Sequence, residues 1–278
     1  MRFALLAVLC LVPDESWVNP LKTPGPGVES KTFASVSMKR DVGYTIYLPP
    51  GYKDGKDKYP VIYYLHGMTD CESTHPQLFG ILDKAIKAGE VKPMILVYTM
   101  CGRTSWYADA PDGSVMGESV FVKELIPHVD ATYRTAATPE GRGLIGWSMG
   151  GHGALKFGLS RPDLFSSVVS FGGGFLKGED LMKRNGDLVK QMFGDAARFD
   201  EQSPWTLVKK GSVKVGLRFA VGTKDFLLEP NRKMKALLEE LKVPFEYEEI
   251  EGVGHEPPKV FAAQGLKALQ FHAARLKG

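Results

Sequence analysis

Apolar runs and stretches of helical pattern alternate along most of this chain, and this alternation constrains the fold more than any other feature. Short runs rich in branched and aromatic residues occur at 61–65, 94–98, 144–145 with its flanks, 168–171, 216–221 and 245–250. Helical stretches occur at 77–88, 117–133, 149–160, 230–242 and 258–276. Apolar strands joined by helices predict a mostly parallel sheet that is covered by helices on both faces.

The regions outside this alternation predict three further features. Residues 17–31 are rich in Pro and Gly and predict an extended lead-in to a domain at 32–278. The pattern at 33–37 and the run at 43–48 predict an antiparallel hairpin. The stretch at about 174–211 interrupts the alternation and predicts a helical insertion over the carboxyl edge of the sheet, where open α/β sheets bind their ligands.

The first residues predict export. Met1 and Arg2 are followed by ten apolar residues, a length too short to span a bilayer but typical of a secretory signal peptide, here at about 1–16. No clear cleavage site follows, and Leu9 is bulkier than the residue that usually precedes a lipoprotein cysteine such as Cys10. The prediction is therefore a secreted or periplasmic protein without stable membrane insertion. A buried strand or a frayed end, with a cytoplasmic location, is the alternative.

Charge and cysteine content exclude two classes of function. Thirty-five basic and 32 acidic residues give a formal charge of +3 with no dense basic run, which argues against nucleic acid as a partner. Without a Cys-x-x-Cys or Cys/His cluster, no metal site is predicted. Cys71 and Cys101 both follow predicted strands, so a disulfide and two free thiols remain open.

The segment Gly146-Trp147-Ser148-Met149-Gly150 lies directly between an apolar run and a helical stretch whose first turn is built from small residues. A serine in G-x-S-x-G at a strand-to-helix turn is typical of a nucleophile elbow. The turn is strained, so side chains on either glycine would collide with neighbouring backbone. The helix that starts beneath Ser148 favours negative charge there.

A serine nucleophile needs a base and a carboxylate that orients the base, and in this kind of site they follow in the order Ser, Asp or Glu, His. His255 lies in a loop after the last predicted strand and is the predicted base, whereas His272 lies inside the terminal helix. Asp225 follows the preceding strand and is the predicted acid. Glu229, its competitor, opens the next helix just before a proline.

The developing oxyanion needs two backbone N–H donors. Met149, directly after the nucleophile, is one prediction. The loop that begins at His66 and Gly67 supplies the other, with the Met68 N–H favoured and Gly67 as the alternative. His66 itself precedes the elbow, and its expected role is to brace this loop by hydrogen bonds.

Two aromatic residues follow the strand at 94–98 and should lie over the same edge. Trp106 and Tyr107 either contact an acyl or aromatic group of the substrate, or cap the core. His75, His128 and His152 have no comparable context and are assigned structural or surface roles.

Several of these segments together resemble a known family. The residues His66-Gly67, the segments 105–109 and 146–155, and Gly254-His255 resemble the esterase D or putative esterase group of α/β-hydrolases. This group includes feruloyl and acetylxylan esterases of carbohydrate esterase family 1, S-formylglutathione hydrolases and mycolyltransferases. The resemblance covers about residues 33–275 and implies a cofactor-independent enzyme with Ser148, Asp225 and His255 as its triad and Met68 and Met149 as its oxyanion donors.

The resemblance and the predicted export favour a serine carboxylesterase that hydrolyses feruloyl or acetyl esters on carbohydrate. An S-formylglutathione hydrolase or a general short-chain esterase is the first alternative, because residues 66–71 resemble those hydrolases. An acyltransferase with the same triad is the second, and a binding protein without catalytic activity is the third. The sequence predicts neither the acyl group nor the oligomeric state.

Overall fold

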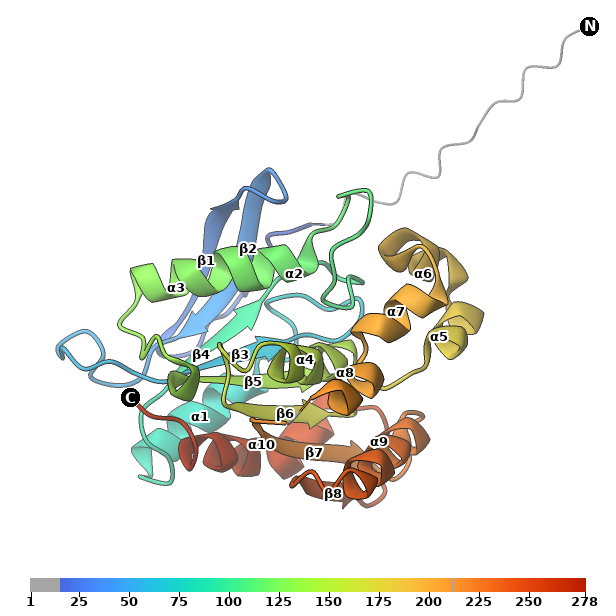
Figure 1. The fold of residues 1–278 in the computed structure, drawn as a ribbon. Helices are drawn as coiled ribbons and strands as arrows, with labels where there is room; N and C mark the ends of the chain where they lie inside the picture. Colours follow the sequence, from blue (N-terminus) through green and yellow to red (C-terminus); the bar gives the residue numbers. More distant parts are fainter. Residues whose placement is uncertain (1–15, 212) are drawn as a thin grey trace, which may run out of the picture.

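The fold is built on one eight-stranded mixed sheet (Figure 1) in a computed structural model that describes residues 16–211 and 213–278. The strand order is β1-β2-β4-β3-β5-β6-β7-β8. The strands are β1 (Val28–Ser35), β2 (Arg40–Tyr47), β3 (Val61–Leu65), β4 (Ile95–Thr99), β5 (Arg142–Trp147), β6 (Ser167–Phe171), β7 (Gly216–Gly222) and β8 (Glu246–Ile250). The predicted signal peptide, apart from its final residue, lies outside the described residues.

The pairing of the strands confirms the predicted mostly parallel sheet and its hairpin. β1 pairs antiparallel with β2 and β2 antiparallel with β4, whereas the other five pairings, from β4 through to β8, are parallel. The first strand begins at Val28, inside the predicted lead-in, and ends two residues before the predicted end. The polar and partly exposed residues 29–32 of this edge strand hide its start in the sequence.

Helices cover both faces of the sheet. One face carries α1 (Gln77–Lys87) and α10 (Pro257–Ala273). The other face carries α2 (Gly117–Ser119), the π-helical segment η1 (Val120–Leu125), α3 (Ile126–Thr132), α4 (Met149–Ser160), α8 (Pro204–Lys210) and α9 (Leu228–Glu240). A short 3-10 turn, η2 (Pro139–Gly141), leads into β5. Successive residues of β3 alternate between the two apolar cores: Tyr63 belongs to the core under α4, and Tyr64 to the core under α10.

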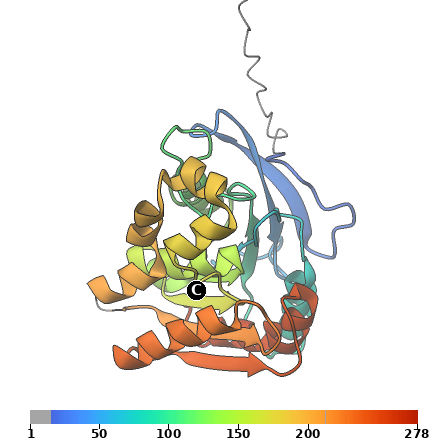
Figure 2. The same cartoon turned by 90° about the vertical axis from the view of Figure 1, so that its right-hand side faces the viewer.

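The segment at 174–211 is helical, as predicted. It contains α5 (Gly178–Arg184), α6 (Gly186–Phe193), α7 (Ala196–Gln202) and α8, and these helices lie beside the carboxyl ends of the parallel strands (Figures 1 and 2). Phe199 of α7 packs edge-on against Trp106 with ring centroids 5.4 Å apart. The Trp205 indole N–H of α8 donates to the Phe175 carbonyl at 3.1 Å. The insertion is therefore fixed to the loops that surround Ser148.

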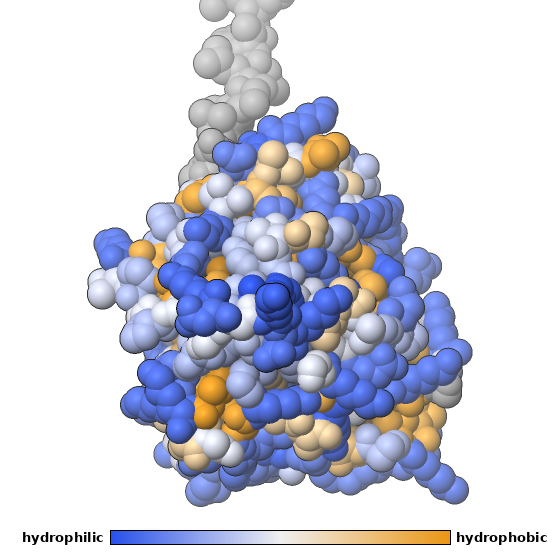
Figure 3. All heavy atoms as spheres, turned by 90° about the vertical axis from the view of Figure 1, so that its left-hand side faces the viewer, coloured by the Kyte–Doolittle hydropathy of each residue, from blue (hydrophilic) through white to orange (hydrophobic). Residues whose placement is uncertain are grey.

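The edge of the sheet opposite the carboxyl ends of the parallel strands presents a different surface. The face seen from that side carries mostly hydrophilic side chains, among which apolar residues are scattered rather than gathered into one large area (Figure 3). This agrees with the mixed charge of the sequence.

Candidate active site

Ser148 occupies the turn between β5 and α4 in a conformation that few residues adopt. Its φ is +55° and its ψ −114°, in a region that costs a non-glycine residue about 1–3 kcal/mol. The flanking backbone is crowded: a side chain on Gly146 would collide with the Gly150 carbonyl, and one on Gly150 with the Leu65 carbonyl. The turn is held from outside by hydrogen bonds from the Ser148 N–H to Phe171 and from the Gly174 N–H to the Ser148 carbonyl, at 2.9 and 2.8 Å.

A chain of hydrogen bonds connects this serine with the predicted base and acid. His255 Nε2 lies 3.0 Å from the Ser148 hydroxyl oxygen, and His255 Nδ1 lies 2.7 Å from Oδ2 of Asp225. The Asp225 carboxylate is buried, and its other oxygen accepts the Leu227 N–H at 2.8 Å. The imidazole tautomer that donates from Nδ1 to the carboxylate leaves Nε2 free to accept the serine proton.

The other candidates for base and acid lie elsewhere. His272 is buried in α10, where its Nδ1 lies 2.7 Å from the Ser167 hydroxyl. Glu229 pairs with Arg232 on the exposed side of α9 at 3.0 Å. The structure therefore brings together the three residues that the sequence favoured and separates them from both competitors.

The imidazole of His255 is enclosed by two aromatic rings, which the sequence prediction did not include. The Trp147 ring lies 4.4 Å away, centroid to centroid, and the Phe226 ring 4.6 Å away. Trp147 is buried, whereas Phe226 is 60% exposed and lies at the surface of the site. The only sequence signal for Phe226 is its position directly after Asp225.

The two predicted oxyanion donors belong to the first turn of α4 and to the loop after β3. Met149 is the first residue of α4, so its N–H has no acceptor within the helix. Met68 follows Gly67 in the loop after β3, and within the described residues its N–H donates to no backbone carbonyl. A side chain on Gly67 would lie 2.7 Å from the Trp147 ring, so only glycine lets this loop run so close to the elbow. The assignment of Met149, Met68 and Gly67 to the binding of the oxyanion stays a prediction.

For Trp106 and Tyr107 the structure favours the packing alternative. Both are buried, and the Tyr107 hydroxyl donates to the His66 carbonyl at 2.9 Å. The Trp106 ring packs edge-on against His152 with centroids 5.1 Å apart. Both adopt positive φ, +49° and +57°, and the Trp106 N–H donates to Met149 Sδ at 3.3 Å, so this packed loop lies against the first residue of α4.

The remaining histidines of the site region are structural. His66 Nδ1 lies 2.7 Å from the Gly67 carbonyl, which confirms the bracing role, and burial lowers the pKa of His66 to about 4. Burial also lowers the pKa of His152 to about 3, and its Nδ1 lies 3.2 Å from the Gly174 carbonyl.

The two described cysteines are buried and are not joined in a disulfide. Cys71 and Cys101 are both buried free thiols, and burial raises the pKa of Cys101 to about 12. Among the described residues, no three or more His, Cys, Asp or Glu side chains are grouped to hold a metal ion. No helix at 16–211 or 213–278 combines the length and apolarity needed to cross a membrane.

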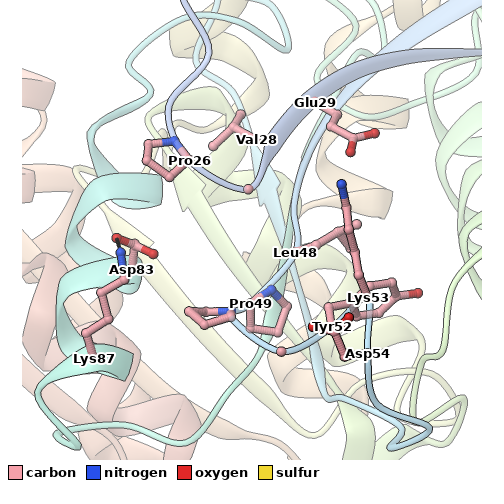
Figure 4. Close-up of a pocket in the computed structure, with 13 residues that line it drawn as sticks. Pro26, Val28, Glu29, Leu48, Pro49, Tyr52, Lys53, Asp54, Asp83 and Lys87 are labelled. Carbon is pink, nitrogen blue, oxygen red and sulfur yellow. Dashed lines mark hydrogen bonds and ion pairs between the residues drawn. The ribbon is translucent and has the colours of Figure 1, made fainter.

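A pocket of about 420 Å³ lies at the opposite edge of the sheet, between the start of β1, the end of β2 and α1 (Figure 4). Asp83 and Lys87 in its wall form an ion pair at 2.7 Å, and Asp83 also accepts the Tyr47 hydroxyl at 3.2 Å. The Asp83 and Lys87 side chains of this pocket are therefore paired within the protein, and Ser148, Asp225 and His255 are not among the residues that line it.

A mixed sheet covered on both faces, with a serine at the sharp turn between its fifth strand and the following helix, defines the α/β-hydrolase class. Within that class, a family model described as "Putative esterase" matches residues 35–262. The chain therefore belongs to the putative esterase family.

Individual relatives and solved structures agree with this assignment. An esterase of Mycobacterium tuberculosis is 36% identical over 146 residues, which are 51% of this chain and 31% of that protein. An endo-1,4-beta-xylanase/feruloyl esterase of Xylanibacter ruminicola is 31% identical over 176 residues, 60% of this chain and 24% of that protein. The chain thus matches less than a third of the length of these relatives.

Among solved structures, a ferulic acid esterase has a TM-score of 0.78 at 25% identity, with 90% of this chain and 98% of that chain covered. An S-formylglutathione hydrolase from Agrobacterium tumefaciens has the same TM-score at 18% identity, with 94% and 100% covered. The second likeness shows the fold alone.

Proposed function

We propose that this protein is a serine carboxylic ester hydrolase that cleaves feruloyl or acetyl esters on carbohydrate. The observation that carries the proposal is the hydrogen-bonded chain from Ser148 through His255 to the buried Asp225. Such a chain supplies what a serine hydroxyl lacks, a base placed to remove its proton and a carboxylate that orients the base.

The reaction proceeds in two halves. The Ser148 oxygen attacks the ester carbonyl while His255 Nε2 takes its proton, and the N–H groups of Met68 and Met149 bind the oxyanion. The tetrahedral intermediate collapses, the bond to the leaving alcohol breaks, and His255 returns the proton to that alcohol. Water then attacks the acyl-enzyme with His255 again as the base, and the free acid and Ser148 are restored.

The substrate class is supported by the relatives rather than by the site. One curated relative is named an endo-1,4-beta-xylanase/feruloyl esterase, and one solved structure of the same fold is a ferulic acid esterase. The exposed ring of Phe226 beside His255 offers an apolar surface for a planar acyl group.

The test compares kcat/KM on methyl ferulate, acetylated xylan and S-formylglutathione, with Ser148→Ala and Asp225→Asn as variants. We expect Ser148→Ala to lose about 10⁶-fold and Asp225→Asn about 10⁴-fold of kcat. A preference above about tenfold between substrates, about 1.4 kcal/mol in the transition state, assigns the class. Unchanged turnover by Ser148→Ala would overturn the catalytic assignment, and preference for S-formylglutathione would replace the carbohydrate ester.

The acyltransferase alternative and the domain organisation are tested separately. Adding an acceptor sugar during turnover and analysing products distinguishes ester transfer from hydrolysis.

Export, which is proposed from residues 1–16 alone, is tested by sequencing the N-terminus of the protein recovered from its host. A fragment at 32–278 lacks the first four residues of β1, so loss of its activity would place the start of the catalytic domain before residue 32.

A further inference from the structure

The loop that carries the Met68 N–H contains a strained residue. Thr69, the next residue, has a φ of +70°. A β-branched residue in this region is a conformational outlier, at a cost of about 1–3 kcal/mol, and it persists only where its surroundings fix it. The backbone at Met68 is therefore held in place by contacts from outside the loop.

Arg103 supplies these contacts from the loop after β4. The Thr69 N–H donates to the Arg103 carbonyl at 2.7 Å. In return, Arg103 Nη1 donates to the Thr69 carbonyl, also at 2.7 Å. Both backbone polar groups of the strained residue are thus paired with one arginine, which fixes the peptide groups on either side of Thr69. The Met68 N–H belongs to the preceding peptide group, whose Gly67 carbonyl accepts the Asp70 N–H at 3.2 Å, so the position of this N–H depends on the same fixed turn.

The other end of the guanidinium is held by the segment that precedes β1. Arg103 Nη2 donates to Oδ1 of Asn19 at 2.8 Å. The Asn19 side chain also donates to Glu72 Oε2 at 3.2 Å, and its backbone N–H donates to Glu72 Oε1. Glu72 is 1% exposed and closes the same loop three residues after Thr69.

Trp17 anchors this segment to the sheet. Its side chain is buried in the core under α4, and its carbonyl accepts the Gly43 N–H of β2 at 2.7 Å. The contacts from Trp17 to Glu72 therefore join the segment before the first strand to both ends of the loop beside Ser148. The segment predicted as an extended lead-in thus contacts both the sheet and the loop after β3.

We propose that Arg103 and Asn19 are positioning residues that hold the Met68 N–H toward the oxyanion, so that the segment before β1 is part of the active-site structure. This inference rests on the proposed hydrolase mechanism. It assigns a role in catalysis to residues that touch neither the serine nor the ester, and it predicts that their loss weakens binding of the transition state more than binding of the substrate.

The experiment measures kcat and KM on p-nitrophenyl acetate for Arg103→Ala, Arg103→Lys and Asn19→Ala. Titration with a fluorophosphonate gives the concentration of active sites in each preparation, so that kcat is expressed per active site. We expect kcat of Arg103→Ala to fall about 10- to 100-fold, the range for weakened oxyanion stabilisation, with KM changed less than about twofold. Lys keeps the charge and one donor but not the fork geometry, so Arg103→Lys should lie between wild type and Arg103→Ala. Asn19→Ala should show a smaller fall in kcat.

A second measurement separates positioning from stability. The inhibition constant of a boronic acid, whose oxygen mimics the oxyanion, should rise in proportion to the loss of kcat/KM. Arg134→Lys is the matched control, because Arg134 also donates to backbone carbonyls, those of Tyr52 and Asp57, but at the opposite edge of the sheet. It should leave kcat unchanged.

The outcomes distinguish the two proposals. If Ser148→Ala is inactive but the Arg103 and Asn19 variants retain full kcat and full boronic acid affinity, the positioning role is wrong and the hydrolase stands. An equal loss in Arg134→Lys, or a loss of affinity for substrate instead of kcat, also overturns the positioning role. Should Arg103→Ala fail to fold, Arg103→Lys and Asn19→Ala decide the question by the same measurements.

Discussion

At the scale of single residues, the aromatic rings around His255 determine how the imidazole can move. Trp147 is fixed by the core, where it also packs edge-on against Phe261. Phe226 also contacts the imidazole and is itself approached by Arg184 of α5, whose guanidinium carbon lies 5.9 Å from the ring centre. Contact with both rings restricts rotation of the imidazole away from the orientation in which one nitrogen meets Asp225 and the other Ser148.

We predict that Phe226→Ala lowers kcat/KM about 3- to 10-fold, because the imidazole gains rotational freedom and the productive orientation becomes less populated. Stability should change by no more than about 0.5 kcal/mol, since the ring is mostly exposed. The measurement is ester hydrolysis alongside thermal unfolding. Leu241→Ala, an exposed apolar residue directly after α9, is the control and should leave kcat/KM unchanged. Equal activity of Phe226→Ala and wild type would contradict the orienting role.

The residues of the hydrogen-bonded chain were predictable because their identity depends on chain order and on the ends of strands. Ser148, Asp225 and His255 each follow a strand that the apolar pattern already indicated. Phe226 and Arg103 were not predictable, since their contacts depend on ring orientation and on loops that meet only in the folded chain. Trp106 was ambiguous for the same reason, because nothing local revealed the contacts of its ring with His152 and Phe199.

At the scale of elements, helix α4 lies unusually close to its neighbours. A side chain on Gly150 would collide with the end of β3, and one on Gly153 would lie 2.5 Å from the ring of the fully buried Tyr107. Small residues in the first turn of α4 are thus required by packing as well as by the elbow. This close approach places the N-terminus of α4, with its unpaired N–H groups, directly beneath Ser148.

We predict that Gly153→Ala destabilises the fold by about 1–3 kcal/mol, because the added methyl group cannot be accommodated without moving a core ring. Gly80→Ala in α1 is the matched control. Nothing lies within 4 Å of the position its methyl group would take, so the better helix propensity of Ala should stabilise by up to about 1 kcal/mol. Urea unfolding of both variants checks the opposite signs. Stabilisation by Gly153→Ala would show that the Tyr107 ring yields.

Helices and strands were predictable where hydrophobic periodicity alone determines them. The prediction was incomplete where a proline changes the hydrogen bonding of a helix whose hydrophobic periodicity continues. The central strands and α4 agree with the sequence pattern to within about one residue at most ends. The helix predicted at 117–133 is instead divided by the π-helical η1, directly before Pro127 near the start of α3. A proline lacks the N–H that would continue the regular ladder, and hydrophobic periodicity does not indicate how the helix accommodates that loss.

At the scale of the whole molecule, three neutral histidines are distributed through the core. His66 follows β3, His152 belongs to α4 and His272 to α10, and all three are buried. Burial lowers the pKa of His66 to about 4 and the pKa values of His152 and His272 to about 3. Burial of Glu72 has the opposite effect on the pH dependence of stability, because it raises the pKa of that carboxyl.

The sign of the pH dependence follows from these shifts. In the unfolded chain each histidine binds a proton near its ordinary pKa of about 6.5, whereas the folded protein does not bind one until about pH 4 or 3. The stability that the three contribute is therefore complete above about pH 6.5 and is lost as the pH falls. Glu72 is one group whose protonation favours the folded state at lower pH, so three histidines outweigh it.

We predict that the free energy of unfolding falls with a slope that approaches about 4 kcal/mol per pH unit between pH 6 and 4, about 1.4 for each histidine. Urea unfolding at several pH values measures it. Because desolvation rather than surface charge is the main cause, about 0.5 M salt should leave the slope nearly unchanged. His272→Asn removes one titrating group and should reduce the slope by about a third, whatever it costs in stability at pH 7. If the slope of this variant equals that of the wild type, His272 does not contribute to the loss of stability in acid, and its assignment as a buried neutral histidine is wrong.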